Sequence, residues 1–375
     1  MSVTSSADAA YSLGHITANQ FEGTLDALSV DELDRLARLS SLTEEQARVL
    51  SAHLLARAES LCPTRNRRAD GGELHPLAQR LVAWWHGYAG SPAKTDSNGF
   101  IVEVADMGSE PAEPAEPWSK QQIRAIQMTW GEGFMEPGGR AFGKRLLGLA
   151  KVTSNHSVLD LTTGLGGTAA NAAKDDGLWI DALEPDPDLA ERAREFVNSW
   201  GLSDRVKVNH ADFDNLELPA RHYDVAFSRE RLFAIKNKKQ VLQRVADSLK
   251  RDGALLLVDF TIADEHANHE DLNEWMSTEP RRPFPWSSEF YRQALEHLGF
   301  EVRYNQDISE DYTDLINQSW LKSVRKINDG EVDPQIEKYL MEDGEIWLAR
   351  AKAMKAGVLS TRKIHAVLRN APDPE

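Results

Sequence analysis

The stretch SVLDLTTGLGGTA, residues 157–169, decides how this chain folds. It runs from a short apolar segment that ends in Asp160, through a glycine-rich turn, into the helix-compatible segment 168–174. Gly164 and Gly166 allow a tight turn and leave no Cβ to obstruct a ligand that lies across the backbone. The start of the following helix offers unpaired N–H groups and the positive end of a helix dipole. The stretch therefore predicts a strand, a turn and a helix that together can cradle a ligand.

Two common nucleotide-binding patterns fit this turn poorly. A phosphate-binding loop needs a Lys directly after its glycines, and the dinucleotide pattern Gly-x-Gly-x-x-Gly is met only in part. The order Asp160-x-Thr162-x-Gly164-x-Gly166 instead resembles motif I of the class I S-adenosylmethionine (SAM)-dependent methyltransferases, with Thr162 at the place of the first glycine. The resemblance implies SAM as the cofactor, although the turn alone is equally compatible with an ordinary tight turn.

Two further strand-like segments, residues 178–184 and 206–212, also end in acids, Glu184 and Asp212. Glu184 lies at the interval where a doubly wound fold places a carboxylate that binds a ribose. Because the carboxyl ends of parallel strands meet at one edge of the sheet, where ligands bind, three acids at this edge strengthen the interpretation as a SAM site.

The remaining segments complete an α/β prediction. Strands are expected at residues 223–227, 254–260, 300–305 and 361–368, the last of them antiparallel. Helices are expected at 285–298 and 335–355, the second broken or bent near Gly344. The predicted fold is a Rossmann-like, seven-stranded class I methyltransferase sheet with an N-terminal helical domain.

The composition limits the kind of protein. The 375 residues are 41% hydrophobic and 27% charged, which suits a globular chain with an α/β core and a smaller second unit. The formal net charge of −16 disfavours nucleic acid as a partner, because such proteins present a basic face. There is no run of eighteen apolar residues, no signal-peptide pattern and only one cysteine, Cys62, so we expect no membrane partner and a cytoplasmic location.

The chain before residue 118 has its own organisation. The sequence predicts a flexible N-terminus at 1–20, a helical domain at 21–89 and a Pro/Glu-rich linker at 90–117. The helical domain could serve dimerisation, act as a lid or dock a partner, so a homo-oligomer through these helices is one open alternative. The SAM-dependent methyltransferase domain is assigned to residues 118–375.

The segment WGEGFMEPGG, residues 130–139, indicates which group of SAM-dependent methyltransferases the chain resembles. It is similar to the Phe-Gly-Glu-Gly-Phe…Gly-Gly entry of the phosphoethanolamine N-methyltransferases, and FSRE at 227–230 is similar to their Tyr-Ser-Arg-Asp. The likeness covers about residues 118–370, and the glycine-rich segment suits a lid better than a packed connector. The cofactor site implied by the strand ends and the resemblance consists of Trp130, Asp160, Thr162, Gly164, Gly166, Glu184, Pro185, Asp212, Phe213 and Arg229.

The acceptor side departs from that family. A Tyr and a His that hold the substrate and take its proton in the family correspond by ungapped count to Trp118 and Ala234. Two phenolic positions that hold the phosphate correspond to Phe260 and Pro283. Phosphoethanolamine itself is therefore disfavoured.

Two cations at the acceptor side do match the family. Arg281 and Arg350 correspond to its phosphate-binding cations, and with Trp118 and Tyr291 they form the predicted substrate site. We expect a related amine, or another small-molecule acceptor with an anionic end.

Glu132 and Glu230 are the candidate catalytic groups, because either could receive a proton or hold an ammonium group. The plainer alternative for them is an ion pair with Arg229 or a solvated loop. Methylation of an amine nitrogen is the favoured function. The alternatives are an O- or C-methyltransferase of secondary metabolism and a non-catalytic SAM-binding regulatory protein. The His266 and His269 segment suits a polar loop better than a metal site, so no metal is expected.

Overall fold

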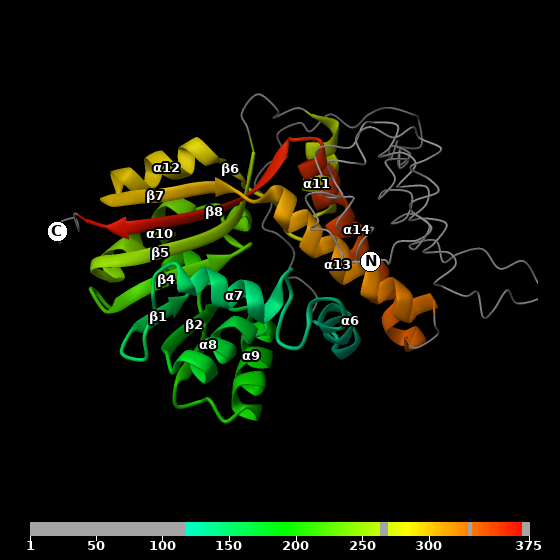
Figure 1. Cartoon of the computed structure of the whole chain (residues 1–375), viewed down its shortest axis with the longest axis horizontal. Coiled ribbons are helices and arrows are strands. Elements are labelled where there is room, and N and C mark those ends of the chain that lie inside the picture. Colours follow the sequence, from blue (N-terminus) through cyan, green and yellow to red (C-terminus); the bar gives the residue numbers. More distant parts are fainter. Residues whose placement is uncertain (1–117, 263–268, 329–331, 370–375) are drawn as a thin grey trace, which may run out of the picture. The chain divides into compact units, whose positions relative to one another are not determined.

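A mixed β-sheet organises the part of the chain that the structure describes, residues 118–262, 269–328 and 332–369 of a computed structural model (Figure 1). The sheet has eight strands, seven of them in the order β3-β2-β1-β4-β5-β8-β7, and the short β6 pairs with β5. The strands are β1 Ser157–Asp160, β2 Trp179–Glu184, β3 Val206–His210, β4 Tyr223–Arg229, β5 Leu249–Ile262, β6 Trp286–Ser287, β7 Phe300–Asp307 and β8 Leu359–Leu368.

Strand direction divides the sheet into two parts. Strands β1 to β5 pair in parallel, so their carboxyl ends meet at one edge, as the sequence predicted. Strand β8 enters between β5 and β7 and is antiparallel to both. The predicted α/β sheet is therefore confirmed, with β6 as an addition that the sequence did not indicate.

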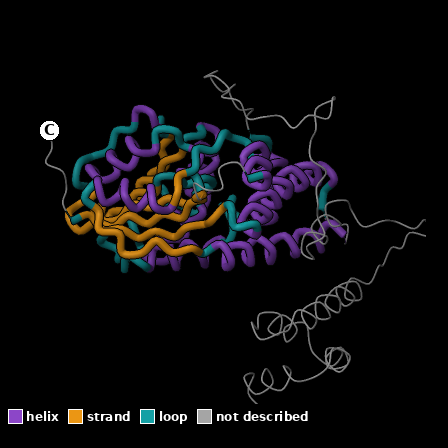
Figure 2. Tube along the Cα trace, turned by 90° about the horizontal axis from the view of Figure 1, so that it is seen from above, coloured by secondary structure: helices purple, strands orange, loops and turns teal. Residues whose placement is uncertain are grey.

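Helices cover both faces of the sheet and extend past its ligand-binding edge. They are α6 Lys120–Trp130, α7 Gly139–Gly148, α8 Gly167–Asp176, α9 Pro187–Ser199, α10 Lys238–Ser248, α11 Glu270–Thr278, α12 Ser288–His297, α13 Ser309–Asn328 and α14 Pro334–Lys355, with short 3-10 turns η1 Phe213–Asn215 and η2 Leu232–Ala234. In Figure 1, α6, α11, α13 and α14 form a group beyond one end of the sheet, and Figure 2 shows the strands and this helical group at opposite ends of the described chain.

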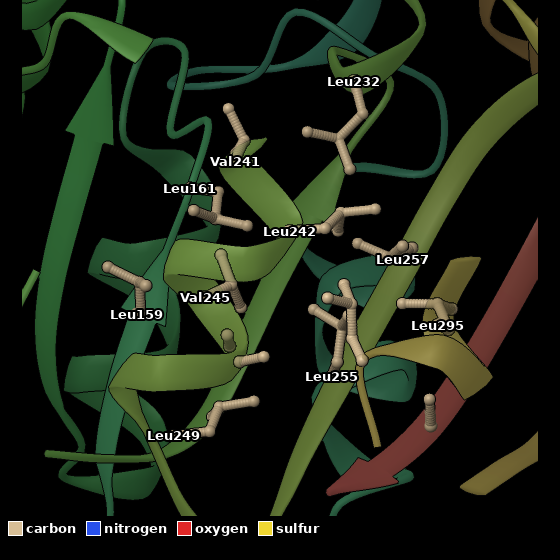
Figure 3. Close-up of a cluster of buried hydrophobic side chains, with 14 of the residues drawn as sticks. Leu159, Leu161, Leu232, Val241, Leu242, Val245, Leu249, Leu255, Leu257 and Leu295 are labelled. Carbon is tan, nitrogen blue, oxygen red and sulfur yellow. The ribbon is translucent and has the colours of Figure 1, made fainter. Parts of the chain in front are cut away.

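One large apolar core fixes the parallel strands in place. Leu159 of β1 and Leu255 of β5 pack with Val241 and Val245 of α10 and Leu295 of α12 (Figure 3). Each of these side chains is fully buried, and burying one such side chain stabilises a fold by about 1.5–3 kcal/mol. The core therefore holds the carboxyl ends of the strands rigidly at the edge where the predicted site residues lie.

Two local expectations need correction. The helix expected at 285–298 starts only at Ser288, because residues 286–287 pair with β5 and the Ser287 hydroxyl caps the helix by accepting the Phe290 N–H. The helix expected to break near Gly344 is continuous from Pro334 to Lys355. Gly344 is buried within it, so the missing side chain serves close packing and not a break.

The predicted N-terminal tail, helical domain and linker lie outside the described residues, as does His266. Within the described ranges, no helix combines the length and the apolar character that a bilayer crossing requires. The same ranges contain no cluster of three or more His, Cys, Asp or Glu side chains that could hold a metal ion.

Candidate active site

The glycine-rich turn after β1 is held against the loop that follows α6. Gly164 and Gly166 adopt the left-handed conformation, with φ of 57° and 85°, which glycine tolerates without strain. The Gly167 N–H donates to the Gly133 carbonyl oxygen at 2.8 Å. A Cβ on Gly167 would lie 2.3 Å from that oxygen, so only glycine permits this approach. We call residues 131–138 the entry loop, and its backbone forms one wall of the turn.

Glu184, at the end of β2, holds the turn from the other side. Its Oε2 accepts the Gly164 N–H at 2.8 Å, and its Oε1 accepts the Asp186 N–H at 3.1 Å. Burial raises the pKa of Glu184, while the guanidinium of Arg231, 4.0 Å from Oε1, favours the charged form. The carboxylate is thereby fixed in position beside the turn.

Two buried polar atoms beside the turn have no partner within hydrogen-bond distance among the described residues. They are Oδ2 of Asp160 and the hydroxyl of Thr163, although the Thr163 side chain lies near enough to Asp160 to favour the charged form of its carboxyl. The other oxygen of Asp160 accepts the Thr162 N–H at 3.2 Å, and burial raises the pKa of this carboxyl to about 7. The Thr162 hydroxyl lies 2.9 Å from that of Ser228, which ties β1 to β4. Thr162 thus has a structural task at the place where the resemblance implied a glycine.

The other predicted cofactor residues surround this turn at different depths. Pro185 is half-buried beside Glu184, and Phe213 is buried in the core. Asp212 is exposed and caps η1, where it accepts the Asp214 N–H at 3.0 Å. Hydrogen bonding from the Asn215 side chain lowers the pKa of Asp212, so this residue stays ionised at the rim.

Arg229, at the end of β4, is engaged by protein groups on several sides. Its guanidinium donates to the Pro137 carbonyl at 2.8 Å and to the Thr168 hydroxyl at 3.2 Å. It also pairs with Glu136 at 3.2 Å and lies 4.8 Å from the centre of the Phe142 ring. Arg229 therefore fixes the entry loop to β4 and α8. Its Nε is buried without a hydrogen-bond partner among the described residues, and the sequence-based assignment of Arg229 to the cofactor stays a prediction.

Glu230 follows directly and has an unusual environment. It adopts a positive φ of 53°, which is uncommon outside glycine and concentrates at functional sites. Its carboxyl is buried, and Oε1 has no hydrogen-bond partner in the described part of the chain. Burial, and then the nearby Glu136, raise its pKa to about 8, against the opposing charges of Arg229 and Arg350. The result is a buried carboxyl that holds a proton near neutral pH and can exchange it with a ligand at the carboxyl edge of the sheet.

Glu132, the other candidate catalytic residue, is exposed in the entry loop. Trp130, assigned to the cofactor from the sequence, instead turns toward α14, where its indole N–H donates to Asp343 at 3.1 Å. Its ring packs against Trp320 and Trp347 at centroid distances of 6.2 and 4.7 Å.

The predicted substrate residues are separated into two groups. Trp118 and Arg281 both donate to Oδ2 of Asp186, at 3.0 and 2.7 Å, on the cofactor side beside Glu184. Arg350 makes a two-pronged ion pair with Glu279, at 2.6 and 2.8 Å. The two cations are thus not brought together.

Tyr291, the fourth predicted substrate residue, is fully buried below this edge. Its hydroxyl donates to Oδ2 of Asp259, whose Oδ1 accepts the Phe233 N–H at 3.1 Å. Burial raises the pKa of Asp259 to about 6, and the ammonium of Lys238 opposes the shift. Tyr291 therefore helps to position η2 through its hydrogen bond to Asp259.

Sequence reasoning missed several residues of the site. Arg231 faces Glu184 from the segment after β4, and Asp343 and Trp347 come from α14, far along the chain. Burial raises the pKa of Asp343 to about 7. The one available signal was the spacing of Asp343 and Trp347, which places them on one face of a helix.

Comparison with known proteins agrees with this geometry. Residues 134–305 match a family model described as a methyltransferase domain. The fold matches Haemonchus contortus phosphoethanolamine N-methyltransferase 2, solved with phosphomonomethylethanolamine and S-adenosylhomocysteine, with a TM-score of 0.59 and 18% identity over 67% of this chain and 59% of that one. Residues 134–305 thus mark the chain as a SAM-dependent methyltransferase.

Two curated relatives of this methyltransferase are named for amine substrates. Plasmodium falciparum phosphoethanolamine N-methyltransferase is 21% identical over 201 residues, which cover 53% of this chain and 74% of that protein. Aphanothece halophytica sarcosine/dimethylglycine N-methyltransferase is 31% identical over 144 residues, 38% of this chain and 51% of that protein, so the match spans about half of its length. Other curated relatives are named as sterol 24-C- and 27-O-demethylrifamycin SV methyltransferases, and the relatives thus differ in the atom they methylate.

The groups around the turn of the methyltransferase fit SAM. The glycine backbone at 164 and 166 leaves room for a ligand to approach, and the buried Oδ2 of Asp160 and the Thr163 hydroxyl lack partners among the described residues. Glu184 presents a fixed carboxylate at the place where a doubly wound fold binds ribose hydroxyls. SAM is the cofactor that this half of the site is built to hold.

Proposed function

We propose that this methyltransferase moves a methyl group from SAM to the nitrogen of a small-molecule amine. The observation that carries the proposal is the buried carboxyl of Glu230, which directly follows β4 and has an oxygen without a partner in the described residues. A group in this position suits a substrate that arrives as an ammonium ion and must lose a proton. The names of the two amine-methylating relatives add support.

The role of Glu230 follows from the chemistry of amines. SAM, when bound, supplies a methyl group whose carbon–sulfur bond breaks as the nitrogen lone pair forms the new bond. An ammonium ion has no free lone pair, so a base must first remove its proton. We infer that a bound ammonium group lowers the pKa of Glu230, which then releases its own proton to solvent, and that the resulting carboxylate holds the ammonium group and receives its proton at Oε1. Exposed Glu132 is less suited, because solvent weakens its hold on a charge.

On the cofactor side, we propose that Glu184 binds the ribose hydroxyls and that the backbone at Gly164 and Gly166 lies against the amino-acid part of SAM. Asp160 would hold the ammonium group of that part. Arg229 then acts indirectly, because its hydrogen bonds fix the entry loop and position the neighbouring Glu230.

An assay of methyl transfer tests the proposal. The purified full chain is incubated with SAM and a panel of primary, secondary and tertiary amines, and the yield of S-adenosylhomocysteine is measured for each. We expect amine-dependent turnover, with the methylated nitrogen identified by mass spectrometry and NMR. Glu230→Gln should lower kcat by about a hundredfold, the usual contribution of a positioned general base.

Matched variants and alternative products decide the outcome. Glu217→Gln removes an exposed carboxylate that is not among the residues assigned to the site and should leave turnover unchanged. Loss of activity in Glu132→Gln but not in Glu230→Gln would assign the proton to the entry loop. A methylated oxygen or carbon in the product would favour the O- or C-methyltransferase alternative, and SAM binding without turnover on any acceptor would favour a regulatory protein.

We further propose a cytoplasmic location, which the single cysteine of the chain supports. Assembly into a homo-oligomer through the N-terminal helices stays a prediction, because these helices lie outside the described residues. Measurement of the molecular mass in solution for the full chain tests it directly.

A further inference from the structure

Several buried aromatic rings pack around Arg350 and beside Asp343 at the acceptor side of the site. Trp130 of α6 packs against Trp320 of α13 and Trp347 of α14. On the side of the sheet, Phe260 of β5 contacts Phe233 of η2 at a centroid distance of 5.3 Å. We call these five residues the aromatic cage. The guanidinium of Arg350 links its two sides, at 4.3 Å from the Trp347 ring and 5.2 Å from that of Phe260.

The charges around the aromatic cage do not balance within the described residues. Arg350 is paired with Glu279, and Arg229 is paired with Glu136. These pairs leave two carboxyl groups, Glu230 and Asp343, both of which interact electrostatically with Arg350. Uncompensated carboxylates in an apolar surrounding are costly and attract a cation. Burial raises the pKa of Glu230 to about 8 and that of Asp343 to about 7, so both carboxyls hold protons near neutral pH and ionise more readily when a cation binds beside them.

Three buried polar atoms on the elements that carry or adjoin the aromatic cage lack hydrogen-bond partners among the described residues. They are Oε1 of Glu230, the hydroxyl of Tyr312 and the indole N–H of Trp320. The three residues are 6%, 0% and 3% exposed, and such deeply buried polar atoms are nearly always paired in folded proteins. Tyr312 reaches the aromatic cage through Phe260, at a centroid distance of 6.5 Å, and Trp320 reaches it through Trp130. These atoms indicate a place where a ligand with polar groups is expected.

The cations that the sequence assigned to a phosphate have other tasks. Arg281 is bound to Asp186 on the cofactor side, and Arg350 is bound to Glu279 and lies among aromatic rings. The phenolic positions of the phosphoethanolamine enzymes are Phe260 and Pro283 here. A phosphate or carboxylate beside Glu230 and Asp343 would disfavour their ionisation further and would find Arg281 and Arg350 already paired with other carboxylates.

We propose that the acceptor is a cationic amine with an apolar or aromatic body and no phosphate or carboxylate group, held by Glu230, Asp343 and the aromatic cage. The inference rests on the proposed amine methylation and names its substrate class. Glu230 and Asp343 recognise the ammonium charge, and the rings hold the carbon body through cation–π and apolar contacts. Asp343 is then a specificity-determining residue that lies 213 residues from its hydrogen-bond partner Trp130.

Equilibrium binding tests the acceptor class without requiring turnover. The probes are phenethylamine, its neutral analogue phenethyl alcohol, phosphoethanolamine and inorganic phosphate. Each is titrated into the full chain saturated with S-adenosylhomocysteine, and binding is followed by calorimetry and by tryptophan fluorescence. We expect phenethylamine to bind at least tenfold more tightly than the alcohol and than phosphoethanolamine, and phosphate not to compete.

Variants locate the binding site. Asp343→Asn should weaken phenethylamine binding about tenfold. Glu342→Gln is the matched control, because it removes the neighbouring exposed carboxylate on the same helix and should change nothing. Trp320→Phe keeps a ring and removes the unpaired N–H, so it is a second, milder test. The affinity for S-adenosylhomocysteine reports in every variant that the domain is folded.

The outcomes separate this inference from the proposed function. Tighter binding of phosphoethanolamine or phosphate than of phenethylamine overturns the inference, as does equal binding by Asp343→Asn and Glu342→Gln. Methylation of a phosphorylated amine would overturn it while leaving amine methylation intact. Binding of phenethylamine in the aromatic cage with no methyl transfer to any amine would leave the inference standing and remove the proposed function.

Discussion

The two halves of the site are built in opposite ways. At the glycine-rich turn of the cofactor side, Thr162 binds a carboxyl two residues earlier and Gly164 binds one 20 residues later, so these contacts follow consecutive strands. Long-range contacts on this side, such as those of Trp118 and Arg281, are made at Asp186 beside the turn. On the acceptor side, Arg350 binds a residue 71 positions away, and Trp130 binds one 213 positions away. A binding site made of neighbours in sequence leaves a readable motif, and one assembled from distant helices does not. The cofactor can therefore be predicted from the sequence, whereas the acceptor site can be identified only from the folded structure.

The largest effect is expected from a substitution that adds one methyl group to the turn on the cofactor side. Gly167→Ala should lower the unfolding free energy by about 3 kcal/mol or more, because its Cβ would lie 2.3 Å from a backbone oxygen that cannot move aside. SAM affinity should fall with it. Urea unfolding and calorimetric titration with SAM measure the two effects.

Gly148→Ala is the matched control for that substitution. Gly148 ends α7, and a Cβ there meets nothing within 4 Å. Alanine should raise the stability by about 0.5–1 kcal/mol, because it restricts the unfolded chain. Equal stability of the two variants would show that the turn is not held against the entry loop.

The second prediction concerns the acceptor side and its dependence on pH. Burial raises the pKa of Glu230 to about 8 in the folded protein, from the ordinary value of 4.5 in the unfolded chain. Between these pH values the folded state keeps a proton that the unfolded state releases, so wild-type stability falls as pH rises through this window. Glu230→Gln has no such proton and should gain about 2–4 kcal/mol relative to wild type between pH 5 and pH 9.

Urea unfolding of both proteins at pH 5, 7 and 9 measures this gain. The charged groups that set the pKa of Glu230 are Glu136, Arg229, Arg350 and Asp259, and the substitution leaves all of them in place. A stability difference that stays constant across the three pH values would contradict a buried, proton-binding Glu230.

A third prediction tests whether the two halves are independent, by removing a carboxylate from the cofactor side. Glu184→Ala loses the bonds to the backbone N–H groups of Gly164 and Asp186. We expect SAM affinity to fall about ten- to thirtyfold, or about 1.4–2 kcal/mol. Phenethylamine affinity should change little, because the acceptor side is built from other elements. Equal losses for the two ligands would mean that the halves are coupled.

The smallest effect is expected at Arg281. Its bond to Asp186 is partly exposed, and Asp186 also accepts from Trp118, so Arg281→Ala should change stability by less than about 1 kcal/mol. Arg282→Ala, at the exposed neighbouring position, is the control. A larger loss of affinity for a phosphorylated amine than for SAM would restore Arg281 to the acceptor, as the resemblance first implied.

The sequence predicted the fold well because the parallel strands are apolar runs that end in acids, and the order of such runs largely determines a sheet. It missed β6 because a two-residue strand carries no periodic pattern. The resemblance to the phosphoethanolamine N-methyltransferases predicted that Arg281 and Arg350 bind a phosphate. In the structure their charges are paired with Asp186 and Glu279, which only the folded chain brings near them. Asp343 was missed for the same reason, since its partner Trp130 lies on another helix.

The position of β8 also determines when the sheet can be completed during synthesis of the protein. This strand begins at residue 359 yet pairs with β5, which ends at residue 262, and with β7. About one hundred residues must be synthesised between them, which takes roughly 5–20 seconds on a ribosome. During that time the edge of β5, and β7 once it has been made, lack the strand β8 with which both of them pair. Nascent chains of this protein should therefore depend on chaperones until β8 has emerged.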